Sequence, residues 1–405
     1  MQASDRRRLG KAGVEVTIMG FGGAPLGNMY QALSDTDALA TVRACYDAEI
    51  RYFDTAPLYG YGLSEHRVGE ALRGRERDSF VLSTKVGRLL RPGDPSTLEH
   101  GQFKDALPFA EVYDYSYDGV MRSVEDSLQR LGTHRIDILL VHDLDVWTHG
   151  SEAARQERVA EFMAGGYGAM IELRDQSAVR AIGAGVNETA ACQDLAERGD
   201  FDCFLLAGRY TLLEQAPLDA FLPLCERRRI ALIIGGAYNT GILATGATPG
   251  AYFQYAPAPP EIMERVRRIE AVCARHGVRL PTAALQFPLG HPAVATVIPG
   301  TRAPAEVEQN LEIFAPEIPA DFWAELKRED LLREDAPTPC FSRAGSPPPP
   351  PASPRHRPQA PVSRAARPRA GRARPASAAP PSREAARRPA PGRSARSRPR
   401  PVARA

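Results

Sequence analysis

Short apolar runs alternate with amphipathic stretches along most of the chain, and this alternation predicts strands and helices in turn. Each run holds four to eight residues, mostly Val, Ile, Leu, Ala or aromatic. Runs of this length and composition are typical of strands that are buried on both faces of a sheet. The eight predicted strands span residues 16–21, 51–54, 80–85, 136–142, 179–186, 201–207, 230–234 and 294–298.

Between these runs, apolar residues recur three and four positions apart, which is the spacing of one helix face. In residues 117–131, for example, Val120, Val124 and Leu128 share a face, and Gly132 provides a stop. A polar insertion separates the fourth predicted strand from the helix that follows it. The other predicted helices span residues 169–175, 190–198, 218–228, 260–276 and 304–314, and two more begin near residues 34 and 64.

The order of these elements predicts the fold. Each strand is followed by a helix, and no Asn-Gly or Asp-Gly hairpin signal lies between strands, so we expect an all-parallel sheet. Eight such units predict a (β/α)₈ barrel. The competing architecture, an open doubly wound sheet, is expected to carry Gly-x-Gly-x-x-Gly after an early strand, and the run at residues 20–25 lacks the third glycine.

Composition divides the chain near residue 336. From Pro337 onward there are 16 Arg, no Lys and one acidic residue, Glu384. The remainder holds 35 basic and 48 acidic residues, so a body of net charge about −13 precedes a tail of about +15. Because the tail buries too little apolar surface to offset its ordering entropy, we expect the barrel over residues 1–336 and a disordered Arg/Pro/Ala-rich tail over residues 337–405.

The arginines of this tail suit contacts with nucleic-acid phosphates. However, Phe341 is its only aromatic residue, and a nearly exclusive use of Arg, Pro, Ala, Ser and Gly is typical of GC-rich coding sequence read in a shifted frame. We therefore favour a non-functional extension. Nucleic-acid binding remains the alternative, for the tail alone.

Cysteine spacing and hydropathy indicate the cellular environment that we expect for the protein. The six cysteines form no Cys-x-x-Cys and have no clustered His partners, which favours buried reduced thiols and no metal site. No apolar segment follows the basic N-terminus, and no stretch approaches 18 uninterrupted apolar residues. We expect a cytoplasmic protein with no membrane segment, as a monomer or weak oligomer.

Polar side chains that carry chemistry stand where three successive predicted strands end. Asp54, Lys85 and His142 close the second, third and fourth strands, and Tyr59 follows in the loop after Asp54. Taken one at a time, these are ordinary turn, surface or core residues. Because barrel enzymes act at the carboxyl ends of their strands, the four together predict an active site at one rim.

At these four residues the chain resembles the aldo-keto reductases, whose catalytic tetrad they match. The resemblance runs from about Met1 to Leu332. It includes the run 183–187, which reads Gly-Ala-Gly-Val-Asn, and the run 298–302, which reads Ile-Pro-Gly-Thr-Arg. Within the family, four further runs are similar to bacterial L-fucose (D-threo-aldose) 1-dehydrogenases and pyridoxal 4-dehydrogenase: residues 20–27, 83–90, 207–213 and 255–260.

The resemblance implies a hydride transfer between a nicotinamide and a carbonyl or hemiacetal carbon, with Tyr59 transferring the proton. An unperturbed Tyr has a pKa near 10, so a neighbouring cation is needed to favour the phenolate, and Lys85 is expected to supply it. Asp54 is expected to orient Lys85 and to keep it charged. His142 is expected to direct the substrate oxygen toward Tyr59.

The resemblance also implies a set of cofactor contacts. Many relatives place an aromatic after the seventh strand to stack on the nicotinamide, whereas this chain has Gly-Gly-Ala-Tyr at residues 235–238, which leaves Tyr238 or Tyr210 as candidates. Asn187 is expected to hold the carboxamide. The cofactor-binding residues expected from the family are Gly22, Asn187, Gly235, Gly300, Thr301, Arg302 and Asn310.

The cofactor is expected to be NADP or NAD, with NADP favoured. Thr301 and Arg302 suit a 2′-phosphate through charge and hydrogen bonds. Ala303, in contrast, stands where an NADP-preferring relative often has a hydroxyl.

The implied function is the oxidation of C1 of an aldose such as L-fucose to a lactone, with a small-molecule sugar or aldehyde as partner. A pyridoxal 4-dehydrogenase and a general aldehyde or ketone reductase are alternatives within the family. From another class, a nicotinamide-binding regulatory subunit, as in the channel β-subunit relatives, is the alternative that the intact tetrad argues against.

Overall fold

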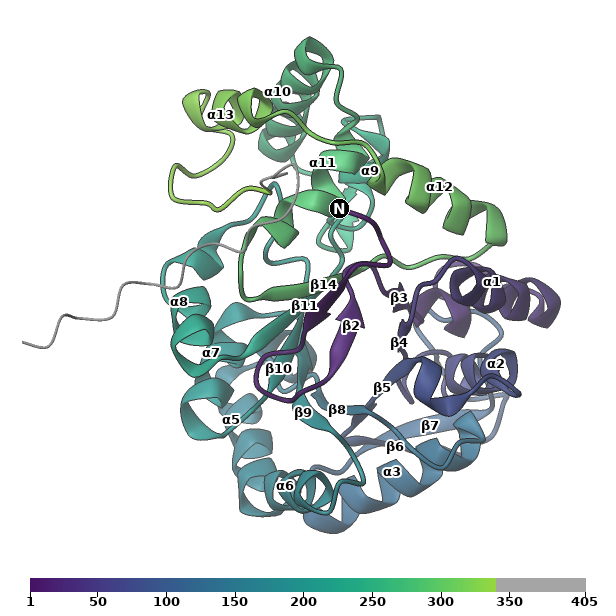
Figure 1. Ribbon diagram of the computed structural model, residues 1–405. Coiled ribbons are helices and arrows are strands. Elements are labelled where there is room, and N and C mark those ends of the chain that lie inside the picture. The colour runs from purple at the N-terminus through teal and green to yellow at the C-terminus, as the bar shows by residue number, and fades with distance from the viewer. Residues whose placement is uncertain (340–405) are drawn as a thin grey trace, which may run out of the picture. The chain divides into compact units, whose positions relative to one another are not determined.

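An eight-stranded parallel barrel forms the centre of the computed structural model, which describes residues 1–339 (Figure 1). Its strands pair in the order β14-β11-β10-β9-β8-β5-β4-β3, and isolated parallel bridges from Met19 to Val297 and from Gly22 to Gly300 join the two edges. The predicted (β/α)₈ fold is confirmed. The barrel strands are β3 (Phe21–Gly22), β4 (Tyr52–Asp54), β5 (Val81–Val86), β8 (Ile138–His142), β9 (Ala181–Val186), β10 (Cys203–Ala207), β11 (Ala231–Gly235) and β14 (Val294–Ile298).

Helices surround the barrel on its outer side (Figure 1). Three of them, α3 (Tyr117–Leu131), α10 (Pro260–His276) and α12 (Pro304–Phe314), have the bounds expected from the sequence. The others are α1 (Asp35–Asp47), α2 (Leu63–Leu72), α4 (Val146–His149), α5 (Glu152–Glu161), α6 (Tyr167–Asp175), α7 (Thr189–Arg198), α8 (Phe221–Arg228), α9 (Ile242–Thr245), α11 (Leu280–Gln286) and α13 (Ala320–Arg328).

Local signals explain why the expected bounds of α3 hold. The hydroxyl of Ser116 accepts a hydrogen bond from the amide of Gly119, at 3.1 Å, and so caps the first turn. Gly132 follows the last turn in the left-handed conformation, with φ 59°. The helix buries Val120 and Val124, two of the three residues predicted to share its apolar face.

The first predicted strand was wrong in part. Residues 15–17 do not enter the barrel but form β2 (Glu15–Thr17), which pairs antiparallel with β1 (Arg6–Arg8). The turn between them uses Gly10 and Gly13, both at positive φ, in place of an Asn-Gly pair, so the hairpin carried no short-range signal. The barrel strand itself begins only at Phe21.

Two more hairpins lie in connections that the sequence left as loops. They are β6 (Arg88–Pro92) with β7 (Phe109–Tyr113), and β12 (Tyr252–Phe253) with β13 (Ala256–Pro257). The polar insertion after the fourth strand forms α4 and α5. The β6–β7 strands are joined by a long connection, for which no turn dipeptide specifies the pairing.

The N-terminal hairpin closes one end of the barrel. Leu9, Val14 and Val16 are fully buried and pack with the side chains that fill the barrel interior, such as Leu140 and Ile233. Figure 1 shows β2 lying across this end of the strands. The other end, at the carboxyl termini of the strands, is therefore the one available to a ligand.

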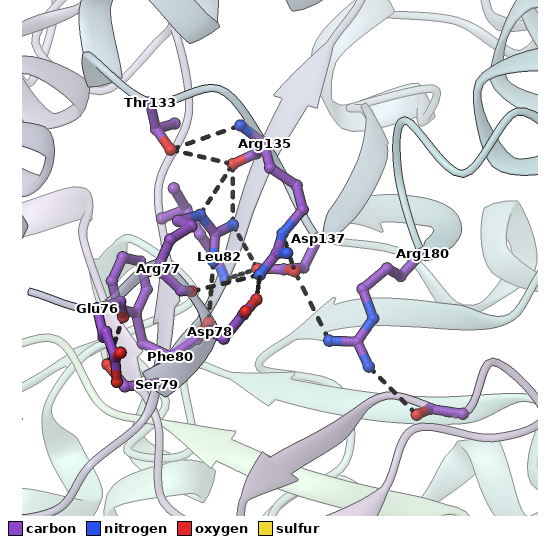
Figure 2. A network of polar contacts seen from close by, with 11 residues as sticks. Glu76, Arg77, Asp78, Ser79, Phe80, Leu82, Thr133, Arg135, Asp137 and Arg180 are labelled. Atoms are coloured by element: carbon purple, nitrogen blue, oxygen red, sulfur yellow. Dashed lines mark hydrogen bonds and ion pairs between the residues drawn. The ribbon is translucent and has the colours of Figure 1, made fainter.

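A buried carboxylate, Asp137, ties the amino-terminal ends of β5 and β8 together (Figure 2). One of its oxygens accepts hydrogen bonds from the amide of Leu82, at 2.9 Å, and from the guanidinium of Arg77, at 2.5 Å. Its other oxygen lies 3.2 Å from Arg135 and 3.7 Å from Arg180. Because Asp137 is fully buried, several cations are needed to offset its desolvation.

Asp137→Ala is expected to lower the free energy of unfolding by about 3–5 kcal/mol, because it leaves the largely buried guanidinium of Arg77 without its carboxylate and the buried amide of Leu82 without its acceptor. Asp78 pairs with the same Arg135 but is 87% exposed, so Asp78→Ala is the matched control, expected to change the stability far less because solvent screens an exposed pair. Urea unfolding of both variants measures the difference. Equal losses would show that the buried network adds nothing beyond a surface ion pair.

The structure describes the chain for three residues beyond the expected end of the barrel at residue 336. Ala336 is buried, and so is Pro339, the last residue that the structure describes. A side chain added at Gly290 would lie 2.6 Å from the carbonyl carbon of Thr338, so the chain packs on the barrel at least this far. Of the predicted tail, residues 337–405, the part from 340 to 405 lies outside the described residues, and the boundary near residue 336 stays a prediction.

Within residues 1–339, no helix is long and apolar enough to cross a bilayer. Five cysteines there are buried free thiols: Cys45, Cys192, Cys203, Cys225 and Cys273.

Candidate active site

The four candidate catalytic side chains meet at the carboxyl end of the barrel. Asp54 is the last residue of β4, Lys85 lies near the end of β5, and His142 is the last residue of β8. Tyr59 comes from the turn after β4. All four line one cavity of about 270 Å³, in the position that the barrel fold predicts for an active site.

A buried ion pair lies at the base of this cavity. Lys85 Nζ donates to Asp54 Oδ2 at 2.8 Å and to the carbonyl of Thr55 at 2.8 Å, and both side chains are at most 2% exposed. The hydroxyl of Ser83 donates to the other oxygen of Asp54 at 2.6 Å. Burial opposes the charge on Lys85, but Asp54 and Tyr59 raise its pKa above the usual value, so the ammonium persists at neutral pH.

Tyr59 lies against this cation. Its ring centroid is 4.7 Å from Lys85 Nζ and 5.9 Å from the imidazole of His142, which it meets edge-on. Burial raises the pKa of Tyr59 to about 12, although the Lys85 ammonium acts in the opposite direction. The phenol therefore keeps its proton at neutral pH, and the cation limits how strongly it is held.

Close backbone packing positions Tyr59, and this was not anticipated from the sequence. A side chain added at Gly27 would lie 2.3 Å from the carbonyl carbon of Tyr59. A side chain added at Gly60, at φ 66°, would lie 2.6 Å from the carbonyl oxygen of Gly27. The two glycines thus lock the turn that carries the phenol, but loop glycines in a single sequence give no sign of the residue that they face.

His142 is held neutral. Burial lowers its pKa well below 6.5, and the cations of Lys85 and Arg88 lower it further. Its Nε2 lies 3.4 Å from a carboxylate oxygen of Asp143, and no described residue hydrogen-bonds its buried Nδ1. A proton on Nε2 is favoured because it faces the carboxylate, and that nitrogen can donate to a substrate oxygen.

Four of the seven expected cofactor-binding residues line the same cavity, namely Gly22, Asn187, Gly235 and Gly300. The backbone of Asn187 is fixed at both ends, since its amide donates to Asp145 at 2.9 Å and its carbonyl accepts from Arg209 at 2.8 Å. No described residue hydrogen-bonds its side-chain amide, which is left available for a ligand.

The other three expected contacts lie apart from this cavity. Thr301 and Asn310 border a small void of about 10 Å³ next to Cys45. Arg302 is 46% exposed and interacts with Glu306, which accepts from its backbone amide at 2.8 Å and from its guanidinium at 3.1 Å. This pairing, which was not predicted from the sequence, joins the loop before α12 to the first turn of that helix.

Neither aromatic candidate for nicotinamide stacking lines the cavity. Tyr210 is fully buried and packs on Phe287, with ring centroids 5.2 Å apart. Tyr238 lies 3.4 Å from Asn310 through its hydroxyl. The aromatic residues that do line the cavity besides Tyr59 are Phe103 and Tyr255, both from loops whose course the sequence did not predict.

Known proteins are similar to this chain in sequence and in fold. The chain is 44% identical over 341 residues to a pyridoxal 4-dehydrogenase from Microbacterium luteolum, covering 82% of this chain and 99% of that one. It is 39% identical to a D-threo-aldose 1-dehydrogenase from a Pseudomonas species, covering 79% and 96%. A solved aldo-keto reductase from Bacillus halodurans, in its holo form, shares the fold with a TM-score of 0.62 at 24% identity, covering 81% and 96%.

A family-wide comparison covers nearly all of the barrel. The sequence model of the Aldo/keto reductase family matches residues 18–330, a range that includes all four side chains at the base of the cavity and all eight barrel strands. The chain therefore belongs to the Aldo/keto reductase family, and it is an NAD(P)-dependent oxidoreductase.

Proposed function

We propose that the protein is an aldose 1-dehydrogenase, which oxidises C1 of a sugar hemiacetal such as L-fucose to a lactone. The observation that carries this proposal is the placement of Tyr59 beside the buried Lys85 cation in a cavity that His142 also lines. The name of the Pseudomonas relative supports an aldose as substrate. The name of the Microbacterium relative supports pyridoxal as the alternative.

The cavity residues fit a nicotinamide. The side-chain amide of Asn187 has no described partner and suits a carboxamide, which needs both a donor and an acceptor. Gly22, Gly235 and Gly300 keep the cavity wall free of side chains where a flat ring would lie. When bound there, the nicotinamide supplies the site that accepts or donates the hydride.

The chain itself handles the proton. Tyr59 donates its proton to the substrate oxygen during reduction and takes the proton up, as phenolate, during oxidation. Lys85 lowers the cost of the phenolate, and Asp54 keeps Lys85 charged and in place. His142, neutral and protonated on Nε2, donates a hydrogen bond to the same oxygen and so holds it toward Tyr59.

Tyr59→Phe is expected to cut turnover by roughly 10²- to 10⁴-fold, the range typical of lost acid–base catalysis, with cofactor affinity little changed. Tyr61→Phe is the matched control, because Tyr61 lies in the same loop but outside the cavity lining, against His100. Steady-state kinetics and cofactor titration measure both effects. Near-normal turnover of Tyr59→Phe would remove Tyr59 from the mechanism.

A substrate panel tests the proposed function directly. L-fucose, L-galactose, D-arabinose and pyridoxal are each supplied with NAD and with NADP, and reduced cofactor is followed by its absorbance. The proposal expects the highest kcat/KM with an aldose. A pyridoxal value that exceeds every sugar value would make the alternative the function, and no turnover with any of the four would leave only a general reductase or a regulatory subunit.

For the cofactor, we propose NAD. The sequence favoured NADP because Arg302 suits a 2′-phosphate, but the guanidinium and the backbone amide of Arg302 are both engaged by Glu306. The Glu306 carboxylate beside Arg302 repels a 2′-phosphate, whereas it can accept a hydrogen bond from the free 2′-hydroxyl of NAD.

Glu306→Gln is expected to strengthen NADPH binding by roughly 3- to 10-fold, the modest gain typical of a charge that solvent partly screens, and to leave NADH binding within about twofold. Glu308→Gln is the matched control, since it makes the same charge change on an exposed position of the same helix. Fluorescence titration of each reduced cofactor measures both constants. Parallel changes for NADH and NADPH would place Glu306 away from the 2′ position.

A further inference from the structure

A fifth charged side chain lines the cavity beside the four already described. Asp143 follows His142 directly, at the carboxyl end of β8, and it is only 7% exposed. Its backbone adopts the left-handed conformation, with φ 52°, and its amide donates to the carbonyl of Gly185 at 2.9 Å. This turn of the chain keeps the carboxylate on the cavity wall.

Arg88 holds one oxygen of this carboxylate. Its guanidinium donates to Asp143 Oδ2 at 2.5 Å, and the same oxygen lies 3.4 Å from Nε2 of His142. Arg88 is 6% exposed and also interacts with Glu111 and with the hydroxyl of Tyr113, at 3.1 Å. The β6–β7 hairpin thus delivers a cation that keeps Asp143 in place.

The second carboxylate oxygen of Asp143, Oδ1, differs from Oδ2 in its contacts. No described residue hydrogen-bonds Oδ1, although the side chain faces a cavity where a ligand displaces water. A carboxylate oxygen in such a place is a strong acceptor that costs free energy when it is left unpaired. A substrate that offers a hydroxyl to Oδ1 is therefore favoured over one that does not.

We propose that Asp143 accepts a hydrogen bond from the hydroxyl on the carbon next to the reacting carbon, and that it selects 2-hydroxy aldehydes and their cyclic hemiacetals. The position of Asp143 relative to the substrate follows from that of its neighbour His142. The substrate oxygen that reacts lies within hydrogen-bond reach of His142 Nε2, and Asp143 is the next polar group along that wall. An aldose carries a hydroxyl at this carbon, so the proposal rests on the proposed function and deepens it.

The test compares substrates that differ only in this hydroxyl. For the wild-type enzyme, kcat/KM for L-fucose is expected to exceed that for 2-deoxy-L-fucose by roughly 10- to 100-fold, the range for a hydrogen bond to a charged group. Asp143→Ala is expected to bring this ratio within about threefold of unity. Asp143→Asn, which keeps an acceptor oxygen and the shape, is expected to give an intermediate ratio and serves where the alanine variant does not fold.

Glu111→Gln is the matched control. Glu111 contacts the same Arg88 but does not line the cavity, so the variant is expected to keep the wild-type ratio. A wild-type ratio near unity, or a ratio unchanged in both Asp143 variants, would overturn the proposal while sugar turnover persists. A ratio that collapses equally in Glu111→Gln would overturn it as well, because the effect would belong to Arg88.

A second substrate pair separates this proposal from the proposed function. Reduction of 2-hydroxypropanal is compared with reduction of propanal, which lacks only the hydroxyl. If L-fucose is not turned over but the hydroxylated aldehyde is preferred in an Asp143-dependent way, the aldose assignment fails and the role of Asp143 stands. If neither pair shows a preference, the role of Asp143 falls.

Discussion

The buried ion pair between Asp54 and Lys85 is the interaction on which the site depends. Two charges removed from water are tolerated only where hydrogen bonds satisfy them, and here the Ser83 hydroxyl and the Thr55 carbonyl do so. The barrel makes this possible because β4 and β5 are neighbours, with Asp54 opposite Ser83 in the register. Gly185 leaves the room for the lysine, since a side chain there would lie 3.2 Å from Lys85 Cε.

The Lys85 ammonium acts in the direction of a lower pKa on both of its neighbours, Tyr59 and His142, but it opposes burial in the first and reinforces it in the second. It works against the burial that raises the pKa of Tyr59, and it adds to the burial that lowers the pKa of His142. The result is a phenol and a neutral imidazole on one cavity wall, so that one is suited to proton transfer and the other to donating a hydrogen bond. The Arg88–Asp143 pair is a second buried cation with its carboxylate, here joining the β6–β7 hairpin to the end of β8.

The sequence predicted the parts of this structure that depend on local pattern. The strand ends located Asp54, Lys85 and His142, and an apolar face with the stop at Gly132 located α3. The elements that were not predicted from the sequence depend on pairing between residues that are far apart in the chain. The β6–β7 hairpin, which carries Arg88, has no turn signal, and the first strand was misplaced because Gly10 and Gly13 supply its turn.

The same limit applies to the cofactor and substrate contacts. A sequence does not show that Glu306 engages Arg302, because four residues of spacing allow the contact without requiring it. Nor does it show that Tyr255 in place of Tyr238 reaches the cavity, since residues 236–259, which hold α9 and the β12–β13 hairpin, carry no local signal for which aromatic side chain faces the barrel.

The most direct test of the central claim is the pH dependence of kcat for oxidation in the wild type and in Lys85→Met. If the buried ammonium assists ionisation of Tyr59, the limb that reports the phenolate moves to higher pH when the ammonium is removed, because burial then acts on the phenol unopposed. Folding is checked by circular dichroism, so that loss of structure is not mistaken for loss of coupling. An unmoved limb in a folded variant would contradict the account, since it would mean that Lys85 and Tyr59 ionise independently.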